Sequence, residues 1–216
     1  DVANLKPGES RRAGWCSPKG RLLATFLVVP HGDGFLLRLA RDLVPAVLRR
    51  LPMFVLRSKV KLADETTQWR QFGIWGSGAA QEIAALGMPV PDGDLQVASV
   101  PEAIAVRAAA DRFLVLVQGE WGARLAGVAG GADAQGWALE EIRAGLPQVV
   151  QATQDLFVPQ MVNLERIAGV DFQKGCYPGQ EVVARTQYRG QLKRRMVRLR
   201  SPVPLQPAQD LYSDDS

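Results

Sequence analysis

The residues best placed to do chemistry lie in the segment Lys174–Glu181, which reads Lys-Gly-Cys-Tyr-Pro-Gly-Gln-Glu. Cys176 stands beside Lys174 and just before a helix that we predict over 178–188. The positive end of a helix and a neighbouring ammonium group both favour the thiolate form of a cysteine. A small thiol that only packs is an equally good interpretation of these residues.

Glycines and polar side chains surround this cysteine. Gly175 and Gly179 indicate tight backbone or the close approach of a ligand. Gln180 and Glu181 fall in the first turn of the predicted helix, where Glu181 also suits the helix dipole. The segment therefore combines a candidate reactive thiol with groups that could bind a ligand.

The sequence gives little support for a catalytic triad or for a metal site. His31 is the only histidine, and it falls in a predicted turn, where a surface role is the better interpretation. No G-x-S-x-G motif accompanies it, which speaks against a Ser-His-Asp triad. Cys16, Cys176 and His31 do not supply the four ligands of a structural zinc site, so we expect no metal site. A cluster shared between two chains stays open.

The composition indicates a folded protein. The chain has 216 residues, of which 47% are hydrophobic and 22% charged, so it can bury a sizeable core and does not resemble a disordered chain. Two cysteines far apart in sequence predict reduced thiols in a cytoplasmic protein. No stretch approaches the roughly 18 to 20 apolar residues of a membrane helix.

The charge is unevenly distributed, with a net value of +4. Seven basic and no acidic residues lie between 185 and 200: Arg185, Arg189, Lys193, Arg194, Arg195, Arg198 and Arg200. Such a stripe suits a polyanion such as RNA. A solvated strand face is an equally good interpretation.

The elements that must position these residues alternate without a strict strand–helix–strand repeat. Periodicity and turn residues predict strands over 20–29, 35–39, 60–62, 71–75, 95–107, 112–118 and 193–199, and helices over 41–51, 79–86, 121–125, 137–144 and 178–188. A glycine-rich linker over 127–136 and an irregular stretch over 146–173 separate the later elements. This mixture predicts an α+β fold of mixed or antiparallel sheets with packed helices.

The segment Lys174–Glu181, followed by Arg185, resembles the signature of the YgfZ proteins. These are relatives of the glycine-cleavage aminomethyltransferase (GcvT) and include the mitochondrial iron–sulfur assembly factors. Pro178 stands at the variable position of that signature.

Further segments extend the resemblance over nearly the whole chain. Phe-Val-Pro-Gln at 157–160, with Asn163 and Leu164, resembles the family segment upstream of the cysteine. Cys-Ser-Pro-Lys-Gly-Arg at 16–21 resembles a turn that opens a strand. Trp137 with Ala-Gly-Leu-Pro at 144–147 resembles the family's tryptophan segment.

The resemblance implies a GcvT/YgfZ-like folate-binding fold. It places a folate-binding core over 1–191, whose leading strand and helix we expect to be missing. Residues 192–216 would then be the truncated start of a C-terminal β-barrel.

The resemblance also implies a pocket for tetrahydrofolate or a derivative. Trp137 would present its ring face to the pterin or aminobenzoate ring, although a tryptophan that fills the core is an equal alternative for the residue alone. Cys176 would be a functional thiol beside the pocket. The other implied folate contacts are Lys174, Gly175, Tyr177, Gly179, Gln180, Glu181 and Arg185, and Arg185 and Arg189 could pair with the folate glutamate carboxylates.

Two departures separate this chain from the aminomethyltransferases. Their acidic pair is replaced by Ala24 and Thr25, and their glutamate before Ala-Gly-Leu is replaced by Arg143. Without these carboxylates the reaction loses its proton-handling and pteridine-binding groups. The expected protein is therefore more an accessory factor than a classical enzyme.

We expect a folate-binding protein that supports iron–sulfur cluster assembly or repair and tRNA modification by iron–sulfur enzymes. Its partners would be folate and iron–sulfur enzymes or assembly proteins, with weak or indirect contact to tRNA and no membrane. The first alternative is a folate-dependent aminomethyltransferase or other one-carbon transferase. The second is an RNA-binding module that uses the basic stripe, which lacks interleaved aromatic residues.

Overall fold

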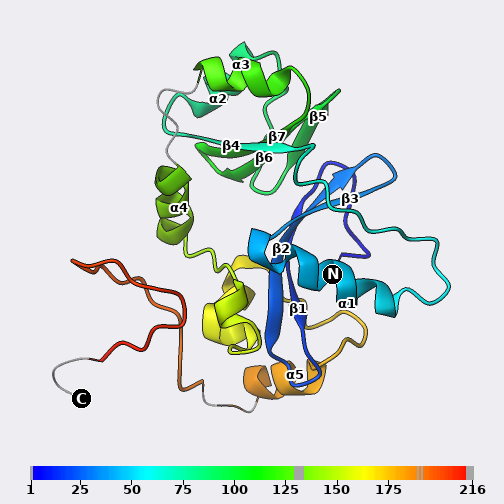
Figure 1. Cartoon of the computed structure of the whole chain (residues 1–216), viewed down its shortest axis with the longest axis vertical. Helices are drawn as coiled ribbons and strands as arrows, with labels where there is room; N and C mark the ends of the chain where they lie inside the picture. Colours follow the sequence, from blue (N-terminus) through cyan, green and yellow to red (C-terminus); the bar gives the residue numbers. More distant parts are fainter. Residues whose placement is uncertain (1, 129–133, 189, 191, 213–216) are drawn as a thin grey trace.

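The fold is built on two antiparallel sheets, one above the other in Figure 1. The computed structural model describes residues 2–128, 134–188, 190 and 192–212. The first sheet has the order β1-β2-β3 and the second the order β4-β7-β6-β5. The strands are β1 (Arg11–Cys16), β2 (Leu22–His31), β3 (Gly34–Arg38), β4 (Arg70–Trp75), β5 (Val97–Val100), β6 (Ala103–Ala109) and β7 (Arg112–Val117).

In the described part of the chain, five α-helices pack around these sheets. They are α1 (Val44–Arg50), α2 (Ala79–Ala85), α3 (Trp121–Val128), α4 (Ala134–Arg143) and α5 (Gln180–Tyr188). In Figure 1, α2 and α3 cover the outer face of the second sheet, and α5 lies at the far end of β1 and β2. The α+β class with antiparallel sheets and packed helices is confirmed.

Strand β7 is buried on both faces, which explains its unbroken apolar run. Phe113 and Val115 pack in the cluster that contains Ile83 of α2 and Leu125 of α3. Leu114 packs on the opposite face, in the cluster that contains β2 residues. The second sheet is therefore a middle layer between helices and the first sheet.

The irregular stretch 146–173 closes the other face of the first sheet. Leu22 and Ala24 of β2 share a buried cluster with Val47 of α1. Val162 and Leu164 join this cluster from two short 3-10 turns, Pro159–Val162 and Leu164–Ile167. The stretch lacks helical periodicity because its apolar residues are placed by these turns.

Sequence patterns missed strand β1 and joined two strands into one. Arg11–Cys16 carries no apolar run, but it pairs with β2 along its length. The single strand expected over 95–107 is the hairpin β5–β6, whose turn includes Glu102 at φ +63°. Helix α4 begins at Ala134, before the expected start at Trp137. Part of the expected linker, 129–133, lies outside the described residues.

Two expected strands are wrong. Residues 193–199 form no strand. The N–H of Met196 donates to the carbonyl oxygen of Met161, 2.7 Å away, so the backbone of Met196 pairs with a 3-10 turn and not with a strand. Residues 60–62 also form no strand, although their apolar alternation suits one.

Candidate functional site

The signature segment is locked against the turn that joins β1 to β2. A Cβ atom on Gly179 would lie 2.5 Å from the carbonyl oxygen of Ser17 and 2.5 Å from the Cα atom of Gly20. Gly179 also has φ +80°, a conformation that favours glycine. Behind it, the side-chain amide of Gln160 donates to the carbonyl oxygen of Val183 on α5, 2.8 Å away. We call this contact of Ser17–Gly20 with Gly179 the glycine interlock.

The side chains of the signature make mostly local contacts. The Lys174 ammonium lies 4.6 Å from the centre of the Tyr177 ring. The N–H of Tyr177 donates to the Gln180 side chain over 3.3 Å. Burial raises the pKa of Tyr177, and Cys16 and Asp171 raise it further. A local cluster thus fixes the loop before α5.

The two cysteines sit in opposite environments, and both are free thiols. Cys16 is buried at the end of β1, and burial raises the pKa of its thiol to about 11, with a smaller opposing effect from Lys174. Cys176 is exposed. Lys174 therefore acts electrostatically on Cys16 as well as being a sequence neighbour of Cys176.

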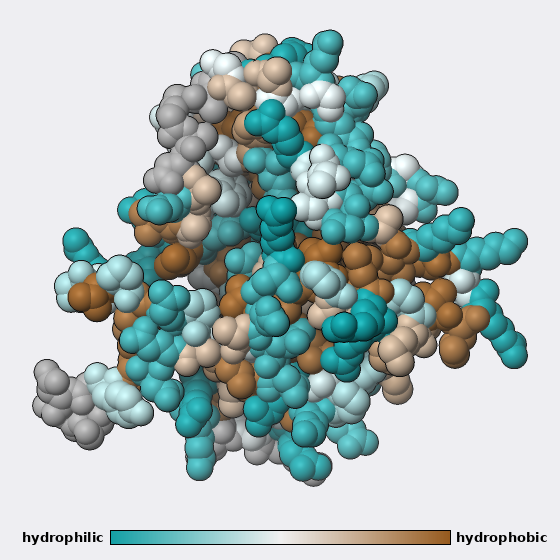
Figure 2. All heavy atoms as spheres, viewed as in Figure 1, coloured by the Kyte–Doolittle hydropathy of each residue, from teal (hydrophilic) through white to brown (hydrophobic). Residues whose placement is uncertain are grey.

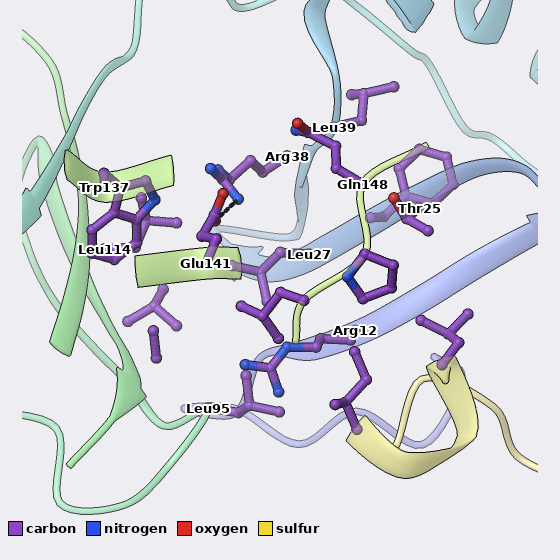
Figure 3. Close-up of a pocket in the computed structure, with 17 residues that line it drawn as sticks. Arg12, Thr25, Leu27, Arg38, Leu39, Leu95, Leu114, Trp137, Glu141 and Gln148 are labelled. Carbon is purple, nitrogen blue, oxygen red and sulfur yellow. Dashed lines mark hydrogen bonds and ion pairs between the residues drawn. The ribbon is translucent and has the colours of Figure 1, made fainter. Parts of the chain in front are cut away.

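A cavity of about 70 Å³ lies between the two sheets, where α4 and residues 146–148 cross. Its lining includes Trp137 and Glu141 of α4, Thr25 of β2, Arg38 of β3 and Arg12 of β1. Figure 3 shows these side chains around one space, although they come from distant parts of the sequence. We call this space the tryptophan cavity.

Trp137 is packed and also lines the cavity. Its ring lies on Gly73 of β4, where a Cβ atom would collide with the indole. Trp75 is tilted against it at 6.0 Å between ring centroids, and the Arg112 guanidinium lies 5.7 Å from the ring centroid. Its buried Nε1 has no hydrogen-bond partner among the described residues. The indole N–H therefore remains able to donate to a ligand.

Charged groups give the cavity a polar wall. The Arg38 guanidinium pairs with Glu141 at 2.8 Å, as Figure 3 shows, and donates to Gln71. Burial lowers the pKa of Arg12 and Arg112 lowers it further, while Asp94 and Glu141 partly offset these effects. Within the described chain no carboxylate is paired with Arg12 at contact distance.

Glu141 is a residue that sequence reasoning missed. It stands four residues after Trp137, so both lie on one face of α4, and this spacing was the available signal. Arg143, at the position of the family glutamate, instead pairs with Glu140 at 2.6 Å. The cavity thus contains a carboxylate, but from a neighbouring position on the helix.

The positions of the family's acidic pair supply no carboxylate here. Ala24 is fully buried in the cluster with α1. Thr25 lines the cavity, and its Oγ1 accepts a hydrogen bond from the N–H of Val149 over 3.1 Å. Of these two positions, only Thr25 gives the cavity a polar group, and that group is a hydroxyl.

The predicted site residues fall into two places. Trp137 lines the tryptophan cavity, whereas the lining does not include Lys174, Gly175, Cys176, Tyr177, Gly179, Gln180, Glu181 or Arg185. Glu181 and Arg185 are exposed on α5. Among the described residues, no group of three or more His, Cys, Asp or Glu side chains could hold a metal.

The basic stripe is also divided. Arg195 pairs with Glu165 at 2.8 Å and donates to Asn163. Lys193, Arg194, Arg198 and Arg200 are exposed, and Arg189 lies outside the described residues. The stripe thus begins on α5 with Arg185 and continues from Lys193 along an irregular segment, not along a strand face.

Comparison with known proteins finds relatives that match nearly the whole chain. It is 32% identical over 202 residues to the tRNA-modifying protein YgfZ of Pectobacterium carotovorum subsp. carotovorum (strain PC1), covering 91% of this chain and 60% of that protein. It is 33% identical over 203 residues to the tRNA-modifying protein YgfZ of Vibrio vulnificus (strain YJ016), covering 92% and 61%. Over about nine tenths of its length the chain is therefore similar to YgfZ proteins. No family model matches it.

The fold agrees with this similarity. The crystal structure of the glycine cleavage system aminomethyltransferase T from Bartonella henselae superposes with a TM-score of 0.71 at 16% identity, covering 88% of this chain and 56% of that one. The GcvT-like fold expected from the signature is confirmed. The chain spans about 60% of the length of the YgfZ relatives. No helix in the part of the chain that the structure describes could span a bilayer.

Proposed function

We propose that this chain is the folate-binding part of an accessory protein that supports iron–sulfur cluster assembly or repair, and through iron–sulfur enzymes the modification of tRNA. The observation that carries the proposal is the convergence of Trp137, Glu141 and Thr25 on one cavity. The name of the YgfZ relatives supports the link to tRNA. Contact of this chain with tRNA is then indirect or weak.

The chemistry of the tryptophan cavity suits one end of a tetrahydrofolate. The Glu141 carboxylate can accept hydrogen bonds from a pterin, and the indole N–H of Trp137 and the guanidinium of Arg12 can donate to its acceptors. At about 70 Å³ the cavity is smaller than the roughly 300–1,000 Å³ of most ligand sites. Folate binding on this proposal therefore moves α4 and residues 146–148 away from β2 and β3.

The signature residues have a different part in this proposal. The glycine interlock holds α5 against the β1–β2 turn. Gly179 serves there by letting two backbone segments approach closely. Arg185 is exposed on α5 and free to meet a ligand carboxylate. The assignment of Lys174, Gly175, Tyr177, Gln180 and Glu181 as folate contacts stays a prediction.

Calorimetric titration with tetrahydrofolate tests the proposal. Trp137→Ala should weaken binding at least about tenfold, because it removes both the ring and the N–H donor. Trp121→Ala is the matched control, since Trp121 of α3 does not line the cavity. A thermal melt of each variant separates lost binding from lost folding. Wild-type protein that binds no tetrahydrofolate would contradict the proposal.

A one-carbon transferase is the less favoured function, because Ala24 and Thr25 leave β2 without a carboxylate. The assay is production of methylene-tetrahydrofolate from an aminomethylated carrier. Sustained turnover by the wild type would reverse this ranking.

The link to iron–sulfur enzymes depends on Cys176. Because its thiol is exposed, it can meet a partner or a cluster. Cys176→Ser should lower the activity of iron–sulfur enzymes in cells, while protein abundance stays unchanged. Unchanged activity would make the cysteine dispensable.

A further inference from the structure

Three side-chain donors of the tryptophan cavity have no acceptor among the described residues. The indole Nε1 of Trp137 is buried without a partner. The Thr25 hydroxyl accepts from the N–H of Val149, which leaves its own hydrogen free to donate. The Arg12 guanidinium has no hydrogen-bond or ion-pair partner in the described chain. Figure 3 shows these three side chains on different sides of the cavity, so a ligand there meets donors from three directions.

The lining of the cavity also has an excess of positive charge. It contains two arginines, Arg12 and Arg38, and one carboxylate, Glu141. Glu141 is already engaged, because the Arg38 guanidinium pairs with it at 2.8 Å. Burial lowers the pKa of Arg12, and Arg112 lowers it further, so the surroundings disfavour a charge that no contact offsets. An anion beside Arg12 would relieve this cost.

The volume and the walls of the cavity indicate what kind of anion fits. A water molecule needs roughly 10–15 Å³ of such space, so the cavity of about 70 Å³ has room for a ligand of about five non-hydrogen atoms. Much of the wall is apolar and includes Leu27, Leu95 and Leu114, which suits a short hydrocarbon group better than a strongly hydrated ion such as phosphate. The planar fork of Arg12 matches a carboxylate.

We propose that the tryptophan cavity, with α4 in the position described, is a binding site for a small carboxylate of about two or three carbon atoms, such as acetate. Arg12 pairs with the carboxylate. The indole N–H of Trp137 and the hydroxyl of Thr25 border the same small space and supply further donors to its oxygens. The site thus uses the three groups that have no acceptor among the described residues.

The small carboxylate and folate exclude each other at this site. Folate binding as proposed above moves α4 away from β2 and β3, whereas the small carboxylate fills the space that exists with α4 in place. Helix α4 is suited to such movement, because none of its residues is buried. Leu139 and Ile142 are exposed on it, and Figure 2 shows apolar side chains among hydrophilic ones where α4 lies. Competition therefore rests on the proposed function, whereas the carboxylate site itself does not.

Proton–nitrogen correlation spectra of the tryptophan indole groups test the carboxylate site. The chain has five tryptophans, and the signal that disappears in Trp137→Phe belongs to Trp137. Sodium acetate should shift this signal, with half-saturation in about the millimolar range expected for so small a ligand. Acetamide has the same shape without the charge and should bind at least about tenfold more weakly, and sodium chloride controls for ionic strength. No saturable shift with acetate, or an equal response to acetamide, would overturn the proposal.

Substitution of Arg12 tests its role in the site. Arg12→Gln removes the charge and should weaken acetate binding at least about tenfold, while Arg12→Lys keeps the charge without the fork and should fall between the two. Arg11→Gln is the matched control, because Arg11 is the neighbour on β1, pairs with Glu9 at 3.8 Å and does not line the cavity. A thermal melt of each variant checks folding. Acetate affinity that is unchanged in Arg12→Gln would assign the anion to another group.

Calorimetric titration with tetrahydrofolate in acetate separates the carboxylate site from the folate proposal. With acetate about tenfold above its half-saturation, the apparent Kd for tetrahydrofolate should rise about tenfold, and this rise should vanish in Arg12→Gln. An unchanged Kd would overturn the competition. If no tetrahydrofolate binds while the Trp137 signal responds to acetate, the proposed function fails and the carboxylate site stands. If tetrahydrofolate binds and acetate gives no response, the carboxylate site alone fails.

Discussion

The glycine interlock and the tryptophan cavity differ in how closely their residues pack. At the interlock, Gly179 and Gly20 bring two backbone segments into contact and leave no room for a ligand between them. At the cavity, side chains from both sheets and from α4 leave about 70 Å³ unfilled. The clearest sequence motif thus marks the tightest packing, and the open space depends on residues scattered along the chain.

The two regions also differ in whether their polar groups have partners. At the signature, Lys174 is engaged by the Tyr177 ring. In the cavity, Trp137 Nε1 is buried without a partner among the described residues. A buried donor without a partner costs about 1–3 kcal/mol, which a ligand acceptor would recover. The cavity is therefore the better place for a ligand, and the interlock the better support for it.

The largest effect is expected from breaking the interlock. Gly179→Ala adds a methyl group about 2.5 Å from the backbone of Ser17 and Gly20 at φ +80°, so it should destabilise the protein by about 3 kcal/mol or more. Gly175→Ala is the matched control, because a Cβ atom there meets nothing within 4 Å. Urea denaturation measures both. Equal stability of the two variants would show that the interlock is not tight.

A smaller effect is expected where the cavity's tryptophan meets β4. Gly73→Ala would push the Trp137 ring from its place, at a cost of about 1–3 kcal/mol for overpacking. The same substitution in a Trp137→Ala background should cost less, because the colliding ring is gone. A double-mutant cycle by urea denaturation measures this coupling. Additive effects would mean that the indole does not rest on Gly73.

The contrast also explains what the sequence could predict. The hairpin β2–β3 and helix α5 were predictable because their apolar periodicity and turn residues are local. Tight backbone at Gly179 was predicted from the glycine itself, whereas the importance of Trp137 was visible only through family resemblance. Glu141 was missed because its role depends on which face of α4 meets the cavity. Residues 60–62 were predicted as a strand from side-chain alternation, which does not reveal whether a partner strand is present.

The smallest effect concerns the two thiols on either side of the interlock. Burial raises the pKa of Cys16 to about 11 from its ordinary value of 9.0. The folded state therefore holds the proton more tightly than the unfolded state, and this contribution to stability is present below about pH 9 and lost as the pH rises towards 11. Cys16→Ala should flatten the stability profile across that window.

Alkylation with iodoacetamide at pH 8 compares the reactivity of the two thiols directly. Cys176 should react readily because it is exposed, and Cys16 should react only after denaturation. Gly179→Ala should then speed the modification of Cys16, because loosening the interlock lets solvent and reagent reach the end of β1. A Cys16 that reacts as fast as Cys176 in the folded wild type would show that the interlock does not shield it.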